Sequence, residues 1–404
     1  MRVLVYPRDL ELGGSSINAI DLAAAIRDHG HDAMVLARPG PLAERVAASG
    51  VPLVTVPVPD RPRPSPVAVR ALRDAVRRHR IDLVHTYEFW TCVEAFYAAG
   101  VLGGGVPVLG TVMSMELADF LPRTVPLTVG FLDLLEEART RRRGPVHLLE
   151  PPVDTAIDRP GVDTSVLAER HGIDRSLLTV VIVSRAAVVM KQEGIERAID
   201  AVAALAPTVP VRLLVVGGGS ALPAIEARAA SVNEKLGRPA VVLTGPMSDP
   251  RPAYQAADVV VGMGSSVLRA MAFGKPAVVV GVDGFSLPVT PETLPTFDRT
   301  GFYGVGTGRP LPGDDPLPGQ LAPLLLDEGR RSALGEWGHR LVQERFSLEV
   351  AAKNLDRIYL DTLERPRGSW QLIGDTAGTT LRVAADKARR GGVVRRALRR
   401  HRPR

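Results

Sequence analysis

Three segments combine glycine, serine or cationic residues with a preceding short apolar run. Gly13 and Gly14 follow residues 2–8, Arg185 and Lys191 follow residues 178–184, and Gly264, Ser265 and Ser266 follow residues 258–263. Glycine lets the backbone approach a ligand closely, and the free N–H groups at a helix start bind anions. Two cations just beyond a strand can hold a diphosphate. Together, these segments predict a site for a phosphorylated ligand.

Each segment also has a simpler interpretation. The pair Gly13–Gly14 could be only a tight strand-to-helix turn, and Arg185 and Lys191 could be solvated surface cations. Gly217 opens another glycine run, 217–219, after the apolar residues 211–216. The run does not complete the six-residue fingerprint of a dinucleotide site, and no acid is clearly placed to hold a ribose. We therefore group Gly217 with the predicted nucleotide site rather than with a separate cofactor site.

The familiar motifs of metal and nucleophile catalysis are missing from the sequence. It contains no HExxH, CxxC, GxSxG or DxD pattern. We therefore expect neither a bound metal nor a resident cofactor.

Apolar runs rich in Val, Ile and Leu alternate with helical patterns along nearly the whole chain. This alternation is typical of parallel sheets covered by helices on both faces, and it predicts an α/β fold with two Rossmann-like domains. Prolines and aspartates interrupt the pattern at residues 148–163. The boundary is expected there, giving domains at 1–158 and 159–345, and a tail at 366–404.

Composition fits a protein with two cores. The chain has 404 residues, of which 45% are hydrophobic and 23% charged, and a single cysteine, Cys92. The absence of a long apolar run and of a signal peptide predicts a cytoplasmic protein. Residues 381–404 hold ten Lys and Arg against one acid. This tail could contact anionic lipid or nucleic acid, or be a solvated, partly disordered extension.

Taken in order, the motifs resemble those of the retaining GT-B glycosyltransferases of family four. The resemblance covers residues 1 to about 365. It rests on the glycine pair at 13–14 and on "PPVDTAIDRP", "SR…K…GI", "LLVVGGGS", "LTGPMSDPRPAYQAADVVVG" and "LRAMAFGKPAVVVG". The segments "RAMAFGKP", "VTPET" and "GFYGVG" are similar to an actinobacterial subgroup.

The resemblance implies a GT-B fold in which a C-terminal helix, residues 346–365, crosses back to the first domain. A nucleotide sugar would be a substrate, not a cofactor, with its base (UDP, GDP or dTDP) undetermined. The acceptor would be a small molecule, a glycan or a lipid-linked sugar. Arg185 and Lys191 would neutralise the leaving diphosphate, helped by N–H groups of Gly13, Gly14 and residues 264–266. The transfer would need no protein nucleophile and no metal.

The sequence departs from the family at three positions. The family's two glutamates fall at Val261 and Arg269, and its histidine falls at Met113 or Ser114. Arginine offers no acceptor for ribose hydroxyls. We expect Arg269 to point at the nucleotide, where lost ribose recognition would make a deoxythymidine donor plausible. The alternative is an exposed or ion-paired arginine.

Substrate contacts from the first domain are expected in "HTYEFWTCVE". His85, Glu88 and Trp90 are predicted to face the site, with Glu88 holding sugar or acceptor hydroxyls and Trp90 stacking on a sugar. A helix cap and core aromatics are the alternative. Two other functions also stay open: a GT-B sugar epimerase or phosphorylase, and a scaffold without catalytic activity. The basic tail leads us to expect weak contact with an anionic membrane and no nucleic-acid partner.

Overall fold

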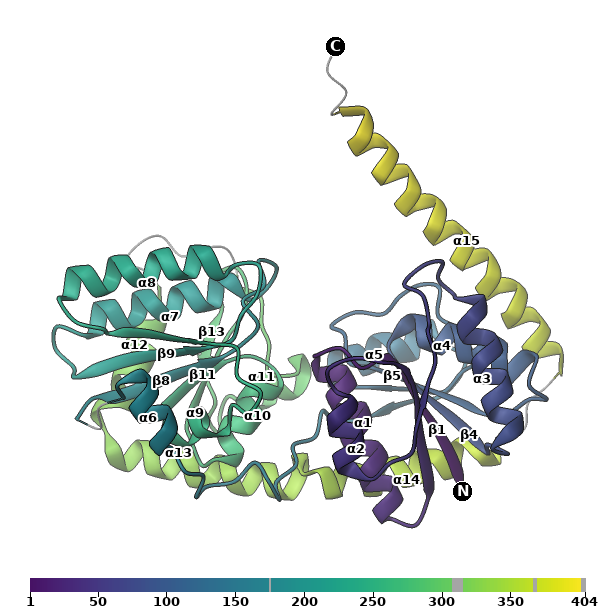
Figure 1. Ribbon diagram of the computed structural model, residues 1–404, viewed down its shortest axis with the longest axis horizontal. Coiled ribbons are helices and arrows are strands. Elements are labelled where there is room, and N and C mark those ends of the chain that lie inside the picture. The colour runs from purple at the N-terminus through teal and green to yellow at the C-terminus, as the bar shows by residue number, and fades with distance from the viewer. Residues whose placement is uncertain (174–175, 307–314, 366–368, 401–404) are drawn as a thin grey trace. The chain divides into compact units, whose positions relative to one another are not determined.

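The computed structural model describes residues 1–173, 176–306, 315–365 and 369–400, with Ser369 and residues 390–400 described by their backbone alone (Figure 1). The chain forms two compact units. The first contains Met1–Pro151 and Leu348–Arg404, and the second contains Pro152–Ser347. Among the described helices, none is long and apolar enough to cross a membrane.

The first unit is built on a seven-stranded parallel sheet, in the order β3-β2-β1-β4-β5-β6-β7. Its strands are β1 (Arg2–Asp9), β2 (Asp32–Arg38), β3 (Leu53–Thr55), β4 (Leu83–Tyr87), β5 (Val108–Val112), β6 (Leu127–Val129) and β7 (Val146–Leu148). The residues of β4 and β5 are all buried, as expected for central strands covered on both faces.

Helices cover both faces of this sheet, and each face has its own apolar core. One core is formed with α3 (Pro66–Arg78), α4 (Phe89–Ala95), the π-helix η1 (Phe96–Val101) and α5 (Leu132–Arg141). The other is formed with α1 (Gly14–Asp28), α2 (Ala43–Ser49) and α14 (Leu348–Glu364). Ser65 caps α3 by accepting a hydrogen bond from Ala68 N, and Pro66 follows at the first helical position.

The second unit has a six-stranded sheet in the order β10-β9-β8-β11-β12-β13, in which only β13 is antiparallel to its neighbour. Its strands are β8 (Leu178–Val183), β9 (Val211–Val216), β10 (Val241–Gly245), β11 (Val259–Gly262), β12 (Ala277–Val280) and β13 (Ser286–Pro288). Each parallel connection contains a helix, as the alternating sequence pattern predicts.

Two cores again lie on opposite faces of the sheet. One face carries α7 (Gln192–Leu205), α8 (Leu222–Leu236) and α12 (Leu317–Leu326). The other carries α6 (Ser165–His171), α9 (Arg251–Ala256), α10 (Ser265–Ala272), α11 (Leu294–Thr300), α13 (Glu328–Leu341) and the π-helix η2 (Val342–Phe346). In Figure 1, α7 and α8 lie above this sheet and α6 and α9 below it.

The division between the units lies seven residues earlier than the expected boundary at 158. Residues 152–158 belong to the second unit, where Val153 N donates to Phe346 O at 2.8 Å. The helix expected at 346–365 is α14, which begins at Leu348 and packs on the first unit, as the resemblance implied. His31 Nε2 lies 2.8 Å from Asp356 Oδ1 and joins α14 to that unit.

The tail is not a disordered extension over its described length. Residues 369–400 form one helix, α15 (Ser369–Arg400), and its first turns pack on the first unit. Residues 366–368 and 401–404 of the predicted tail lie outside the described residues.

Candidate active site

The strand order of the second unit places its predicted ligand residues at one point. The chain runs from β8 to β9 on one side of the sheet and later returns to β11 on the other side of β8. Ligands of open α/β sheets bind where the order reverses in this way, beyond the carboxyl ends of the strands. Arg185 follows β8, and Gly264, Ser265 and Ser266 follow β11. The reversal therefore brings the cationic and glycine-serine segments together.

Lys191 is a half-buried cation at the start of α7. Its pKa is lowered to about 8, first because burial disfavours the ammonium ion and second because the charge of Arg185 is near. In the described part of the chain, neither side chain has a hydrogen-bond or ion-pair partner. Two adjacent, uncompensated cations at a helix start form a site that is complementary to a diphosphate.

The glycine run 217–219 shapes this segment by close backbone contact. A Cβ atom on Gly217 would lie 1.9 Å from Ser184 O, and one on Gly219 would lie 2.5 Å from Ala186 O. Gly217 has φ +141°, and its N–H donates to Gly245 O at 3.0 Å. Gly217 can therefore assist binding by positioning residues 184–186, while its own N–H is already in use.

The start of α10 offers backbone donors. Gly264 adopts φ +61° and has open space at its Cβ position, but its N–H donates to Phe302 O at 2.7 Å. Ser266 Oγ closes the turn through Met263 O and Met263 N. The N–H groups of Ser265 and Ser266 occupy the first two helical positions, where no intrahelical acceptor exists. They are the donors that this helix start can give to an anion.

Two further contacts hold the segments of the site together. A Cβ atom on Gly194, in the first turn of α7, would meet Val280 at 2.9 Å and Met263 at 3.8 Å, so α7 packs closely on the ends of β11 and β12. Glu193 accepts hydrogen bonds from Asp283 N at 3.1 Å and Gly284 N at 2.7 Å. The start of α7 and the turns after β11 and β12 therefore form one connected structure.

Arg269 forms an ion pair within the second unit. Its Nε lies 3.3 Å from Oδ2 of Asp158, and the side chains are 25% and 4% exposed. Asp158 is the compensating acid for a cation in a helix whose start favours negative charge. The ion pair matches the alternative that the sequence left open. Whether Arg269 also contacts a nucleotide stays a prediction.

The first unit repeats the same topological feature. Its strand order reverses between β1 and β4. Gly13 and Gly14 follow β1 at the start of α1, and both have open space at the Cβ position. The N–H groups of the first turn of α1 have no intrahelical acceptors and are available to an anion. The predicted role of this turn is sterically possible.

Glu88 follows β4 at the same reversal point and has a strained backbone. Its φ of +72° and ψ of −176° fall in a region that only glycine normally adopts. The carboxylate accepts from Ser114 Oγ at 2.7 Å and from Met113 N at 3.3 Å. Asn18 on α1 in turn donates to Met113 Sδ at 3.0 Å. Glu88 therefore connects the ends of β4 and β5, and its predicted substrate contact would add to this role.

His85 is not placed as expected, and Trp90 has an aromatic partner in its own unit. His85 is fully buried inside β4, with Nδ1 2.8 Å from the Tyr359 hydroxyl and Nε2 2.6 Å from Thr111 Oγ1. Burial lowers its pKa to about 3. Trp90 stacks on Phe120 with 4.2 Å between ring centroids. The prediction that His85 faces the site is wrong, and Trp90 is an aromatic packed within the first unit.

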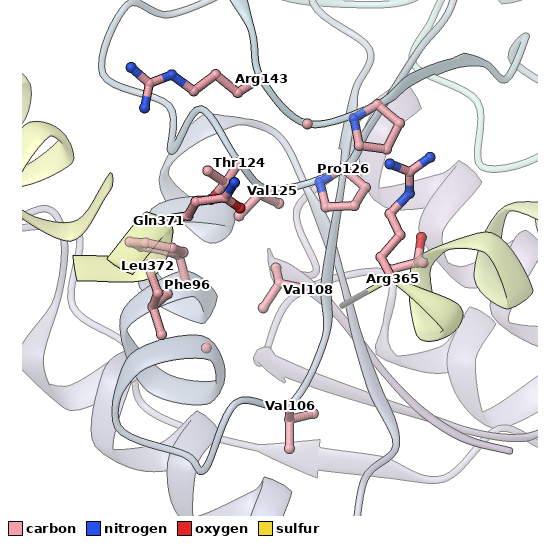
Figure 2. A pocket seen from close by; sticks show the side chains of 14 residues that line it. Phe96, Val106, Val108, Thr124, Val125, Pro126, Arg143, Arg365, Gln371 and Leu372 are labelled. Carbon is pink, nitrogen blue, oxygen red and sulfur yellow. The ribbon is translucent and has the colours of Figure 1, made fainter. Parts of the chain in front are cut away.

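A separate cavity of about 340 Å³ lies in the first unit (Figure 2). Val108 begins β5, and Pro126 and Pro145 precede β6 and β7, so the cavity lies at the amino-terminal edge of the sheet. The predicted site residues lie at the opposite edge. Phe96, Val106 and Leu372 give the cavity an apolar lining without acids. Two cations, Arg143 and Arg365, also line it, and none of the predicted site residues does.

Sequence reasoning missed the residues that orient the site. Asp158, Glu193 and Asn18 act through partners that are distant in sequence, and no spacing rule connects them. Arg197 pairs with Asp315 at 2.7 Å and also donates to Phe285 O, so it holds the segment after β12. The only sign of this role in the sequence is that Arg197 is a single basic residue on the apolar face of a predicted helix. Among the described residues, no three His, Cys, Asp or Glu side chains gather as a metal site.

Family models match both units of the chain. The model described as Glycosyltransferase Family 4 matches residues 12–156, and the model described as Glycosyl transferases group 1 matches residues 178–296. The two matches together cover more than half of the sequence. A search of curated protein sequences found no match.

Solved structures of glycosyltransferases share the fold. A glycosyltransferase from Rickettsia africae is 15% identical, with a TM-score of 0.71 over 90% of this chain and 99% of the other. Anabaena HepE, solved with UDP and glucose, is 15% identical, with a TM-score of 0.67 over 89% and 100%. Sucrose-phosphate synthase from Thermosynechococcus elongatus is 18% identical, with a TM-score of 0.67 over 89% and 98%.

Proposed function

Because the chain is a glycosyltransferase of the GT-B type, with a family 4 domain followed by a group 1 domain, we propose that it transfers a sugar from a nucleotide-sugar donor to an acceptor hydroxyl or amine with retention of configuration. One observation carries the proposal. Within the described residues, Arg185 and Lys191 have no acidic partner, and they follow a strand next to the one that leads to Ser265 and Ser266, at the sheet's reversal point. This arrangement is complementary to a diphosphate leaving group.

In the proposed chemistry, the main contribution of the protein is to stabilise the leaving diphosphate. The bond between the anomeric carbon and the diphosphate oxygen breaks, and the acceptor oxygen or nitrogen bonds to the same face of the sugar. The acceptor's proton passes to the leaving phosphate. Arg185, Lys191 and the N–H groups of α10 stabilise the negative charge that develops there. No side chain forms a covalent bond to the sugar.

The base and the sugar of the donor can be determined by experiment. We propose thermal unfolding in a panel of UDP, GDP and dTDP sugars, since a ligand that binds only the folded state raises Tm more, the further its concentration exceeds Kd. HepE was solved with UDP-glucose, which makes this compound the first probe. Release of nucleoside diphosphate with and without candidate acceptors then tests transfer. The anomeric configuration of the product, measured by NMR, tests retention.

Two controls separate the proposal from its alternatives. Chelation by EDTA should leave turnover intact, because cationic side chains and backbone N–H groups do the work of a metal. Lost turnover that Mg²⁺ or Mn²⁺ restores would refute metal independence. Donor binding without diphosphate release, whatever the acceptor, would identify a scaffold. Conversion of the nucleotide sugar without an acceptor would identify an epimerase.

A further inference from the structure

The helix α15 packs on the first unit along one face. The carboxylate of Asp375 accepts hydrogen bonds from Thr124 N at 2.8 Å, Thr124 Oγ1 at 2.6 Å and Arg123 N at 3.0 Å. Thr380 bonds the Tyr97 hydroxyl at 2.9 Å, and Val383 is buried. The polar and apolar side chains on this face therefore find their partners within the first unit.

The opposite face of α15 exposes a row of large apolar side chains. Trp370, Ile373 and Leu381 are 86%, 59% and 71% exposed. At 100° per residue, these three residues fall within one arc, about half a turn from Asp375 and Val383. Trp370, Ile373 and Leu381 are called the apolar stripe below. A single exposed apolar residue needs no explanation, but three in one row of a docked helix do.

Positive charge flanks the apolar stripe on both sides. By the same helical geometry, Lys387 points about a quarter turn to one side of it and Arg389 about a third of a turn to the other. Residues 390–404 contribute seven further arginines and no acid to the sequence. An apolar face bordered by basic residues is the pattern of helices that lie in a membrane interface.

A cavity of about 480 Å³ between α15 and the body of the first unit is lined by arginines. They are Arg123, Arg141, Arg142, Arg382 and Arg389. Two acids offset part of this charge, because Asp119 pairs with Arg141 and Asp375 pairs with Arg382. In the described part of the chain, the guanidinium groups of Arg123 and Arg389 have no partner. The cations beside α15 are therefore available to external phosphates.

We propose that α15 docks the first unit on the surface of an anionic bilayer. The apolar stripe enters the boundary between headgroups and acyl chains, and Lys387, Arg389 and Arg123 contact lipid phosphates. A bilayer accounts for both features, the exposed apolar stripe and the cations beside it. Nucleic acid would use the cations and leave the stripe exposed, whereas a second copy of the chain would bring two strongly basic tails together. The inference does not depend on the proposed sugar transfer.

The experiment is flotation of the full chain with vesicles of phosphatidylcholine, with and without phosphatidylglycerol. The wild-type protein should float with the anionic vesicles and not with the neutral ones. Leu381→Ser should weaken binding about tenfold, the effect of withdrawing one buried leucine. Its matched control is Leu326→Ser, an equally exposed leucine of the second unit at 70%, which should bind as wild type. Equal weakening by both substitutions, or no flotation with anionic vesicles, would overturn the proposal.

Fluorescence of Trp370 tests insertion directly. Emission should shift to the blue on addition of anionic vesicles, and Trp370→Phe should lose the shift while still floating. Binding without any shift would mean that charge alone acts and that the stripe does not insert. A blue shift that grows with protein concentration, without lipid, would instead show that a second copy covers the stripe. The first result would refute insertion of the stripe, and the second would refute the membrane assignment.

Discussion

Lys191 should make the second unit less stable than it would be with an apolar side chain. Its pKa is about 8, compared with an ordinary value of 10.5, because burial and the charge of Arg185 disfavour the ammonium ion. A difference of that size corresponds to about 3 kcal/mol of unfavourable free energy for the charged form. Lys191→Met keeps most of the side-chain volume and removes the charge. We expect the variant to be more stable at pH 7, by at most about 3 kcal/mol.

The gain from Lys191→Met should depend on pH in a defined direction. Below pH 8, the lysine is protonated in both the folded and unfolded states, and the full cost is present. Between pH 8 and 10.5, the folded state releases its proton while the unfolded state keeps it, so the stability of the wild type rises with pH. The difference between variant and wild type should therefore shrink through this range and vanish above it.

Lys191→Met should also weaken anion binding, because the proposed role of the lysine charge is to bind the diphosphate. Inorganic pyrophosphate is a suitable probe, since it needs no knowledge of the base. Loss of one charge-assisted contact costs about 1.5–3 kcal/mol, or a rise of about 10- to 150-fold in Kd. Binding to the wild type near pH 8 should also take up protons, which calorimetry in buffers of different ionisation enthalpy measures.

Native-state hydrogen exchange of β8 and β11 amides, measured against urea, gives the stability of the second unit. The matched control is Lys275→Met. Burial also lowers the pKa of Lys275, but this residue precedes β12 at the amino-terminal edge of the sheet. The control should gain stability without losing pyrophosphate binding. A less stable Lys191→Met at pH 7, or one that binds pyrophosphate like the wild type, would refute the reasoning.

Three further substitutions test other contacts. Arg185→Glu should lower kcat/KM by about 30- to 1000-fold, from a loss of about 2–4 kcal/mol of transition-state stabilisation. Tm should not fall, because the side chain is exposed and the substitution replaces the cation that repels Lys191; normal turnover would contradict the assignment. Arg269→Gln should cost about 3 kcal/mol of unfolding free energy, because it removes the guanidinium that pairs with the buried Asp158 carboxylate. The double variant with Asp158→Asn should recover part of that cost. If the unfolding free energies of the two single variants, measured in urea, simply add in the double variant, the two side chains are not coupled. Glu88→Gly should be more stable than Glu88→Ala by about 1 kcal/mol, because glycine adopts this φ and ψ without strain; an equal or lower Tm for the glycine variant would show that no strain is stored.

The fold could be predicted because both sheets, apart from the antiparallel edge strand β13, are parallel and covered on both faces. Buried parallel strands appear in the sequence as continuous apolar runs, and the glycines between runs mark the turns. The exact division between the units could not be predicted. It depends on the contacts of residues 152–158 with the far end of the second unit, such as the Val153–Ser347 bridge. Pairings across nearly 200 residues leave no local signal.

His85 shows where the site prediction failed and which signal was available. The residue lies within the apolar run "DLVHTYE", so it belongs to a central strand whose side chains are buried on either face. Only Glu88, which lies beyond the end of the strand, could reach the edge. In choosing site residues, the position of a residue relative to the end of its strand should have counted for more than the chemistry of its side chain.

The cations around the reversal point of the second unit fall into two groups, which the sequence alone cannot separate. Arg197 and Arg269 have acidic partners, Asp315 and Asp158, and both contribute to the structure of the unit. Arg185 and Lys191 have none among the described residues, and burial, together with the charge of Arg185, lowers the pKa of the lysine. Evolution of a stable fold alone would give a half-buried lysine an acid or an apolar replacement. Two unpaired cations at a helix start are therefore better explained by an anion that binds there and leaves, and it is this pair, rather than Arg269, that indicates the substrate.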